Sequence, residues 1–460
     1  MESLGLTYNA KTNRAFLLWA VAGSLFCTGL ALWSPVSLAF VAGAVFVGLF
    51  LSSRTFRWIV FPAVLIFNQF LIRNAGIPYL IGGIAIQPVD WIAIFLVFAV
   101  ALKRILSGSG FFIRTGLEKP IGIFLVAIAL GLFGAPDLEA GIINWGHTAL
   151  YFLAFYAMAA DWKDVPPERI WRGYFFWALL AALSASWQFF TSGGGRSLGL
   201  AGIPLNHLII PVLCFELARL SLGLKTGRWW VVVLFALAAL ATQTRGVWLG
   251  VGVLLAVWPI TGYLLRRFKW LPVRRLVIRV SGAVLLFVVL LLALAPLLGQ
   301  VERRAAQLAE QGGTVYLRLF LWGVAWKLFL SHPVAGIGMG QFAGEMAQFP
   351  EMKNIAVFES VHGLSTHNLL LAFLAETGLV GTLAFLLLLA STVRFAWKRV
   401  QGARTLEELG WRWGFLMVFT VFSLSYLFAG TWDYTFAFLL ALMVLFVQRQ
   451  PVPEERTHAG

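Results

Sequence analysis

Long apolar runs, separated by short polar segments, cover most of the chain. Most of these runs have 16 to 20 residues, close to the ~20 that a helix needs to cross a hydrocarbon core of ~30 Å. The pattern predicts an all-α fold, a polytopic integral membrane helix bundle of about 12 to 14 transmembrane helices with one large polar loop. The predicted spans are 15–33, 36–53, 57–72, 88–106, 120–135, 143–160, 172–190, 203–220, 229–242, 246–264, 278–297, 369–393, 411–428 and 431–448.

Composition excludes a soluble globular protein. Of the 460 residues, 60% are hydrophobic and 12% are charged, whereas soluble domains carry about 25% charged residues. The first apolar run follows Lys11 and Arg14, but no small-residue cleavage site succeeds it, which favours a retained anchor over a signal peptide. Both cysteines, Cys27 and Cys214, lie inside apolar runs, which argues against a disulfide.

The distribution of positive charge predicts the orientation. With the N-terminus placed in the cytoplasm, cytoplasmic loops and helix ends hold all but eight of the 35 Lys and Arg residues. This asymmetry is the positive-inside signature, and it also places the C-terminus in the cytoplasm. The net charge of +15 is therefore explained by the orientation of the chain in the membrane. It predicts contact with anionic membrane lipids, and binding to nucleic acid is not needed to explain it. The eight exceptions are Arg73, Arg196, Arg245, Arg303, Arg304, Arg318, Lys327 and Lys353.

These patterns divide a single membrane domain into three parts. We expect N-terminal transmembrane helices over 1–298, a polar loop with interfacial helices over 299–366, and C-terminal transmembrane helices over 367–460. In the predicted orientation the loop lies on the outer face of the membrane, which is the periplasm if the cell is Gram-negative. Within it, 317–333 is an apolar run interrupted by two cations, which suits a helix lying in the interface. Glycines make 336–342 a flexible segment.

His367 stands where this loop meets an apolar helix. An imidazole titrates near neutrality and can accept a proton from an incoming hydroxyl, so His367 is the candidate catalytic base. Ser365 or Thr366 is a candidate helix cap. Gly378, three turns on, falls on the face of His367 and, with Gly381, allows a neighbouring helix to approach closely. The simpler alternative is an interfacial histidine that only forms hydrogen bonds at a helix start.

Arg245 is the candidate binding residue for an anion. It lies between apolar runs of 14 and 19 residues, and 14 residues make only about 21 Å of helix, so the guanidinium sits near the outer interface. A cation on that side runs against the charge bias, and the planar guanidinium suits phosphate. Arg318 is a candidate second cationic group. The alternative for both is contact with lipid headgroups.

Other polar residues of the outer segments are secondary candidates. No Asp-x-Asp pair and no His/Cys/Asp cluster with metal-ligand spacing occurs there, so neither a metal nor another cofactor is implied. The secondary candidates are Asn368, Arg196, Arg303, Arg304, His362 and Glu359.

Three motifs between roughly 195 and 395 match the motifs of a known protein family. They are His367-Asn368 followed by Gly378 and Gly381, Arg245 with Leu249, and the run of Pro333, Gly336, Gly338 and Gly340. In these motifs the chain resembles the O-antigen ligase and polymerase superfamily of bacterial envelope glycosyltransferases. That family has about twelve spans with a long outer loop before the last three, so the additional predicted spans lie on the N-terminal side.

The resemblance implies a substrate pair and residue roles. The donor would be a glycan on undecaprenyl diphosphate and, in a ligase, the acceptor would be the lipid A–core oligosaccharide. Transfer would invert the anomeric centre without a metal. His367 would activate the acceptor hydroxyl, while Arg245, assisted by Arg318, would bind the diphosphate.

Other functions remain open from the residues. The moderate loop and the overall length favour a ligase over an O-antigen or exopolysaccharide polymerase. A protein O-oligosaccharyltransferase is less favoured, because the sequence ends about a dozen residues after its last span, without the C-terminal region that many protein-glycosylating members carry. A lipid or glycan transporter is the alternative of a different class. Transporters place ionisable groups near mid-membrane and contain repeats, whereas the polar candidates here gather toward one face and no repeat is visible.

Overall fold

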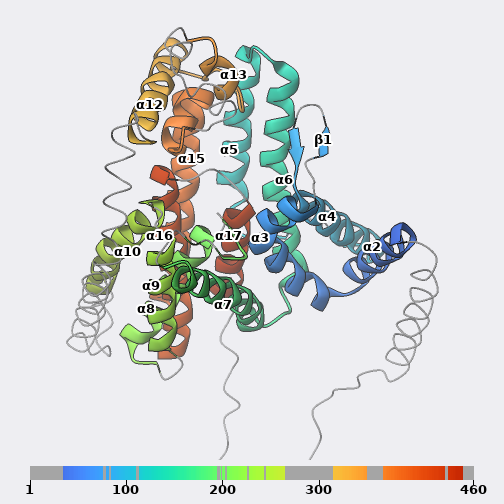
Figure 1. Cartoon of the computed structure of the whole chain (residues 1–460), viewed down its shortest axis with the longest axis vertical. Helices are drawn as coiled ribbons and strands as arrows, with labels where there is room; N and C mark the ends of the chain where they lie inside the picture. The colour runs from blue at the N-terminus through green and yellow to red at the C-terminus, as the bar shows by residue number, and fades with distance from the viewer. Residues whose placement is uncertain are drawn as a thin grey trace, which may run out of the picture. The chain divides into compact units, whose positions relative to one another are not determined.

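The computed structural model describes most of the chain as helices (Figure 1). The described residues are 35–75, 79–81, 84–109, 113–193, 197, 199–202, 205–224, 227–242, 245–264, 314–349, 366–429 and 434–448. The helices and strands are α2 (Pro35–Ser52), α3 (Arg54–Ala75), β1 (Tyr79–Ile81), β2 (Ile84–Ile86), α4 (Pro88–Leu106), α5 (Glu118–Leu130), η1 (Gly131–Gly134), α6 (Leu138–Trp162), α7 (Pro167–Thr191), α8 (Leu205–Leu222), α9 (Trp229–Ala241), α10 (Arg245–Leu264), α12 (Thr314–Ser331), α13 (Phe342–Met346), α15 (Leu369–Gln401), α16 (Leu406–Ala429) and α17 (Tyr434–Gln448).

Each predicted span inside the described residues coincides with a helix. The expected spans at 15–33 and 278–297 lie outside the described residues. The helix expected over 317–333 is present as α12, which ends two residues before Pro333 because a proline ring cannot continue the helix. The predicted domain boundary at 298/299 also lies outside the described residues, and the three-part division stays a prediction.

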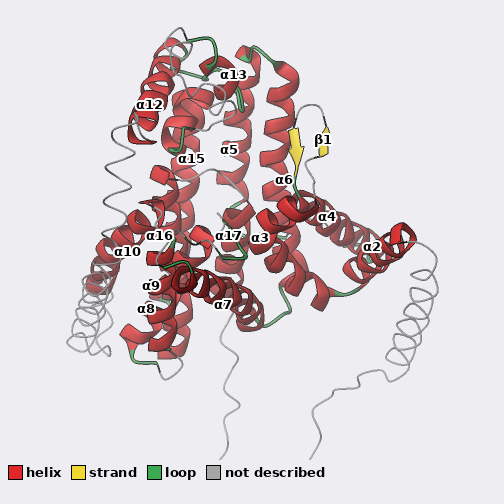
Figure 2. Cartoon of the chain, viewed as in Figure 1, coloured by secondary structure: helices red, strands yellow, loops and turns green. Residues whose placement is uncertain are grey.

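One small element departs from the all-α expectation. β1 and β2 form an antiparallel hairpin in which Tyr79 faces Ile86 and Ile81 faces Ile84 (Figure 2). Gly82-Gly83 stands between the strands in sequence, a pair typical of two-residue hairpin connections. Three-residue strands are too short to produce an alternating pattern, so apolar periodicity cannot predict them.

The residues divide into two compact units, Met1–Arg57 and Trp58–Gly460. In the second unit α17 is the central helix: its residues from Tyr434 to Val447 are all buried, and it packs on α6, α15 and α16. Helix α15 also packs on α5, α12 and α16. These contacts bring the starts of α6 and α15 into one unit with α12.

Length and apolarity alone identify few crossing helices among the described residues. Leu369–Gln401 is long and apolar enough to span a membrane as one helix. Gly43–Ser52 and Arg54–Asn68 are long and apolar enough only together, as a bent pair. Helices α9 and α17 are apolar but shorter. The predicted number of transmembrane helices therefore rests on the sequence pattern.

Candidate functional site

Helix α15 begins beside a strained histidine. His367 has φ of 51°, and no other described residue except glycine has a positive φ. Thr366 fixes this geometry, because its Oγ1 donates to the carbonyl of Asn368 at 2.7 Å and accepts from the Asn368 N–H at 3.2 Å. A left-handed conformation persists only where neighbouring contacts over-determine it, and such residues concentrate at functional sites.

Asn368 is the helix cap. Its Oδ1 accepts from the N–H of Leu371 at 3.1 Å, which satisfies a donor that the first turn leaves open. The expectation of a Thr366 cap is wrong, because the Thr366 hydroxyl is used to hold His367 instead. The other expected cap, Ser365, lies outside the described residues.

Helix α12 places one cationic side chain near this turn and one tryptophan that forms a hydrogen bond with it. Trp322 Nε1 donates to the carbonyl of Thr366 at 3.0 Å, and Arg318 lies one turn earlier on the same side of α12. Burial lowers the pKa of His367 below its ordinary value of 6.5, and the positive charge of Arg318 lowers it further. The imidazole is therefore neutral at neutral pH and able to accept a proton.

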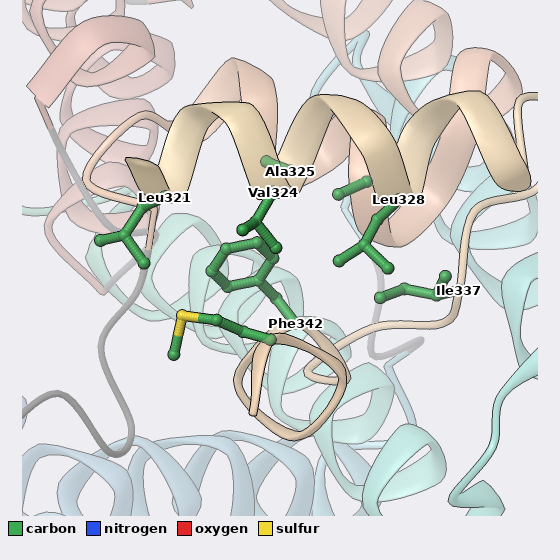
Figure 3. Packing of buried hydrophobic residues seen from close by; sticks show 8 residues of the cluster. Leu321, Val324, Ala325, Leu328, Ile337 and Phe342 are labelled. Carbon is green, nitrogen blue, oxygen red and sulfur yellow. The ribbon is translucent and has the colours of Figure 1, made fainter. Parts of the chain in front are cut away.

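A buried apolar cluster holds α12 against the segments around α15 (Figure 3). From α12 it contains Leu321, Val324 and Leu328, which recur at helical spacing. Burial of such side chains stabilises packing by roughly 1.5–3 kcal/mol each. The cluster fixes the helix that carries Arg318 and Trp322. Its other members are Ala325, Ile337, Phe342, Met346 and Ala375.

Helix α15 is broken at Gly378. That residue has φ 62° and ψ −162°, a region that is essentially restricted to glycine. The expectation of an unbroken helix, with Gly378 on the face of His367, is therefore wrong. A β-carbon on Gly378 would meet the backbone of Val334, so the close neighbour is a loop. Gly381 sits across the break against the side chain of Thr377.

The loop 333–338 satisfies the backbone groups that this break leaves open. The N–H groups of Ile337 and Gly338 donate to carbonyls of α15 before the break, at 3.0 and 2.9 Å. After the break, Leu379 N–H donates to Pro333 at 2.8 Å and Val380 N–H to Val334 at 3.1 Å. Buried backbone groups need such partners. Four hydrogen bonds thus clamp the loop to the helix that His367 precedes.

The glycine segment 336–342, which overlaps the end of this loop, forms a set of tight turns. Gly336, Gly338 and Gly340 all have positive φ, which glycine adopts without steric cost. The carboxylate of Glu376 accepts from the N–H of Phe342 at 3.1 Å and from that of Gly340. Glu376 therefore orders the glycine turns.

The structure brings together only some of the predicted site residues. His367, Asn368, Arg318, Gly378 and Gly381 lie in the packed assembly of α12, α15 and the glycine loop. Arg245 is the first residue of α10, and nothing of its side chain is described. The remaining candidates lie outside the described residues: Arg196, Arg303, Arg304, His362 and Glu359.

Sequence reasoning missed a second histidine. His147 of α6 contacts the buried carboxylate of Asp90 in α4, with 2.5 Å between Nε2 and Oδ1. The two residues are 57 positions apart. The only local signal was Gln87-Pro88-Val89-Asp90, a capping pattern that marks the start of a helix. In the part of the chain that the structure describes, no three His, Cys, Asp or Glu side chains cluster as a metal site would.

Comparison with known families addresses the region that contains His367. A family model described as O-antigen ligase matches residues 230–386. In this segment the chain is similar to the O-antigen ligase family. The matched part includes Arg245, Arg318 and His367, and it indicates glycosyl transfer of the O-antigen ligase or polymerase type. The superfamily consists of membrane proteins. No curated protein matches the chain.

Proposed function

We propose that this protein is an O-antigen ligase of the bacterial inner membrane. It transfers a glycan from undecaprenyl diphosphate to the lipid A–core oligosaccharide at the periplasmic face, with inversion at the anomeric carbon and without a metal. The helices form a polytopic bundle with both termini in the cytoplasm. The observation that carries the proposal is the neutral, backbone-strained His367 beside Arg318, inside the matched family segment.

Exposed apolar faces support the membrane location. Large apolar side chains are exposed on the outer sides of several helices, for example Phe98 at 54%, Val126 at 65% and Trp187 at 74%. On α4 they recur at helical spacing as a continuous stripe. Contiguous apolar surface of this kind is rare on soluble proteins and matches contact with lipid tails. The α4 stripe consists of Trp91, Ile94, Phe98, Leu102 and Ile105.

His367 is the proton acceptor of the proposed reaction. Its neutral ring accepts the proton of the acceptor hydroxyl as that oxygen attacks the anomeric carbon of the donor sugar. The bond from this carbon to the diphosphate oxygen breaks, and the diphosphate leaves with the electron pair. Arg318 and Arg245 stabilise the charge of the leaving group by charge-assisted hydrogen bonds. Fixed guanidinium groups can perform this role in place of a divalent cation.

Reconstitution with a chelator tests the proposal. Purified protein in lipid nanodiscs would receive undecaprenyl-diphosphate glycan, lipid A–core and EDTA. We expect wild-type transfer and a loss of ~10²–10⁴-fold in His367→Ala, the range for loss of a general base. His332→Ala is the matched control, because this exposed histidine bonds the neighbouring Ser331 and should retain activity. Unchanged transfer by His367→Ala would overturn the catalytic assignment.

The product distinguishes this function from its alternatives. Glycan joined to lipid A–core indicates a ligase, longer chains on the lipid carrier indicate a polymerase, and glycosylated Ser or Thr indicates a protein O-oligosaccharyltransferase. Movement of the lipid-linked glycan across the bilayer without a new bond would indicate a transporter.

A further inference from the structure

The pair formed by Asp90 and His147 has no role in the mechanism above. Asp90 is 4% exposed, and its Oδ2 also accepts from the N–H of Gln87 at 2.7 Å. The first turn of α4 is in turn tied to α3, since Asn68 Oδ1 accepts from the N–H of Val89 at 3.3 Å. A buried carboxylate with two fixed partners is a rigid anchor for the ring that contacts it.

This anchor leaves one ring nitrogen of His147 for a ligand. Because Nε2 faces a carboxylate oxygen, Nε2 is the donor of this contact, and Nδ1 is the ring nitrogen that remains for a ligand. Among the described residues no hydrogen bond to Nδ1 is formed. Enzymes use a ring that a buried carboxylate fixes through one nitrogen, with the other nitrogen directed to a hydroxyl group.

His147 is also accessible, unlike the residues beneath it. Its side chain is 26% exposed, and residues 143–147 of α6 are each partly exposed. One turn further on, Tyr151 is buried and packs on the buried Tyr434, with 4.5 Å between ring centroids. The His147 ring lies 5.0 Å from that of Tyr151. The two buried tyrosines therefore pack beside the His147 ring, whose side chain stays partly exposed.

Contacts connect this pair to the glycine loop. Asn144 lies three residues before His147, about 4.5 Å along the helix axis, and its side chain packs against Gly340. Gly340 donates its N–H to Glu376, two residues before the break at Gly378. Gln341 Nε2 also donates to the carbonyl of Asp137, just before α6, at 2.7 Å. The same loop thus contacts both histidine-bearing segments.

We propose that Asp90 and His147 form a hydroxyl-binding subsite for a glycan, in which Nδ1 of His147 accepts a hydrogen bond from a sugar hydroxyl. This rests on the proposed glycosyl transfer. The carboxylate of Asp90 would repel a diphosphate, so a neutral sugar fits the pair better than the charged end of the donor. A fixed polar group among partly exposed residues suits a sugar hydroxyl, because ligand sites orient their ligands with a few precisely placed polar groups.

The variant His147→Gln tests the subsite. Its amide can still donate to Asp90 but offers no acceptor at the position of Nδ1. We expect the KM for one glycan substrate to rise about tenfold, the loss of roughly one hydrogen bond, while kcat stays within about twofold of the wild type. Separate titrations of lipid A–core and of lipid-linked donor show which glycan is bound. His332→Ala should leave both KM values unchanged.

Nuclear magnetic resonance of the wild-type protein provides an independent readout. The chain has six histidines, so ¹⁵N-histidine labelling gives few signals, and the His147 signals are those missing from His147→Gln. Deacylated lipid A–core oligosaccharide and the soluble repeat oligosaccharide are the probes, and one of them should shift the Nδ1 resonance. If His147→Gln does not fold, Asp90→Asn supplies the assignment instead, because it perturbs the same ring.

The outcomes separate the subsite from the proposed function. If both KM values stay within about twofold and neither probe shifts Nδ1, the subsite is refuted while transfer stands. If His147→Gln lowers kcat about a hundredfold at unchanged KM, the ring acts in the chemical step and the binding proposal is wrong. If wild-type protein transfers no glycan but a probe still shifts Nδ1, the proposed function fails and the subsite is retained.

Discussion

Two histidines occupy opposite electrostatic surroundings in this protein. His367 lies beside the cation of Arg318, and backbone contacts of Thr366 and Asn368 hold it in a left-handed conformation. His147 lies inside a regular helix and is held by the buried carboxylate of Asp90. The same side chain is thus positioned by the backbone in one place and by a buried carboxylate in the other.

This difference separates proton transfer from binding. A cation beside His367 disfavours the imidazolium and keeps the ring ready to accept a proton. A carboxylate beside His147 fixes the tautomer and the orientation of the ring, which suits a hydrogen bond of constant direction. Neighbouring charges, more than residue type, assign roles to titratable groups.

The largest expected effect comes from the backbone that supports His367. Gly378→Ala places a side chain in a conformation that costs ~1–3 kcal/mol, and its β-carbon would meet the backbone of Val334. We expect a lower melting temperature in nanodiscs and loss of transfer.

Gly323→Ala is the control for this substitution. Gly323 is in α12, and a β-carbon there meets no atom within 4 Å. Alanine in a helix interior is favoured by roughly 0.5–1 kcal/mol over glycine, so this variant should be as stable as the wild type or more so. Equal melting temperatures for the two variants would refute the clamp between α15 and the loop 333–338.

A smaller effect is expected from the cation. Arg318→Gln removes the charge that lowers the pKa of His367, so this pKa rises toward 6.5. Since the neutral ring is the active form, the acid limb of kcat/KM should move to higher pH. The KM for the donor should rise roughly tenfold or more through the lost charge-assisted bond.

Arg318→Lys separates charge from geometry. It keeps the positive charge, so the acid limb should stay in place, but it loses the planar fork that binds phosphate, so the donor KM should still rise. If the acid limb is the same in wild type, Arg318→Gln and Arg318→Lys, then Arg318 does not lower the pKa of His367, and the electrostatic difference between the two histidines is refuted.

Sequence patterns predicted the helices well and the site in part. Apolar runs such as 172–190 report a buried or lipid-facing helix directly, and α7 follows this run closely. His367 stood out because it stands where the polar loop meets an apolar helix, and Arg318 because it interrupts an apolar run. The assignment of Asn368 as cap required coordinates, since Ser, Thr and Asn are all good caps and stand within four residues.

The missed features depend on contacts between distant segments. Gly378 lies within a largely apolar helical sequence, and the break there is stable because its open backbone groups form hydrogen bonds with the loop 333–338. Asp90 and His147 each sit in ordinary helical sequence, and their pairing arises from the packing of α4 on α6. Periodicity reports which face of a helix is apolar, not which polar groups meet across it.

The central claim is that His367 is neutral when the enzyme works, and a pH titration of its ring tests this most directly. Wild-type protein labelled with ¹⁵N-histidine in nanodiscs would be followed by nuclear magnetic resonance, with His367→Ala assigning the signal. The account predicts a neutral ring at pH 7 and a pKa below 6.5, because burial and Arg318 both disfavour the charged form. A ring that is protonated at pH 7 would contradict the account.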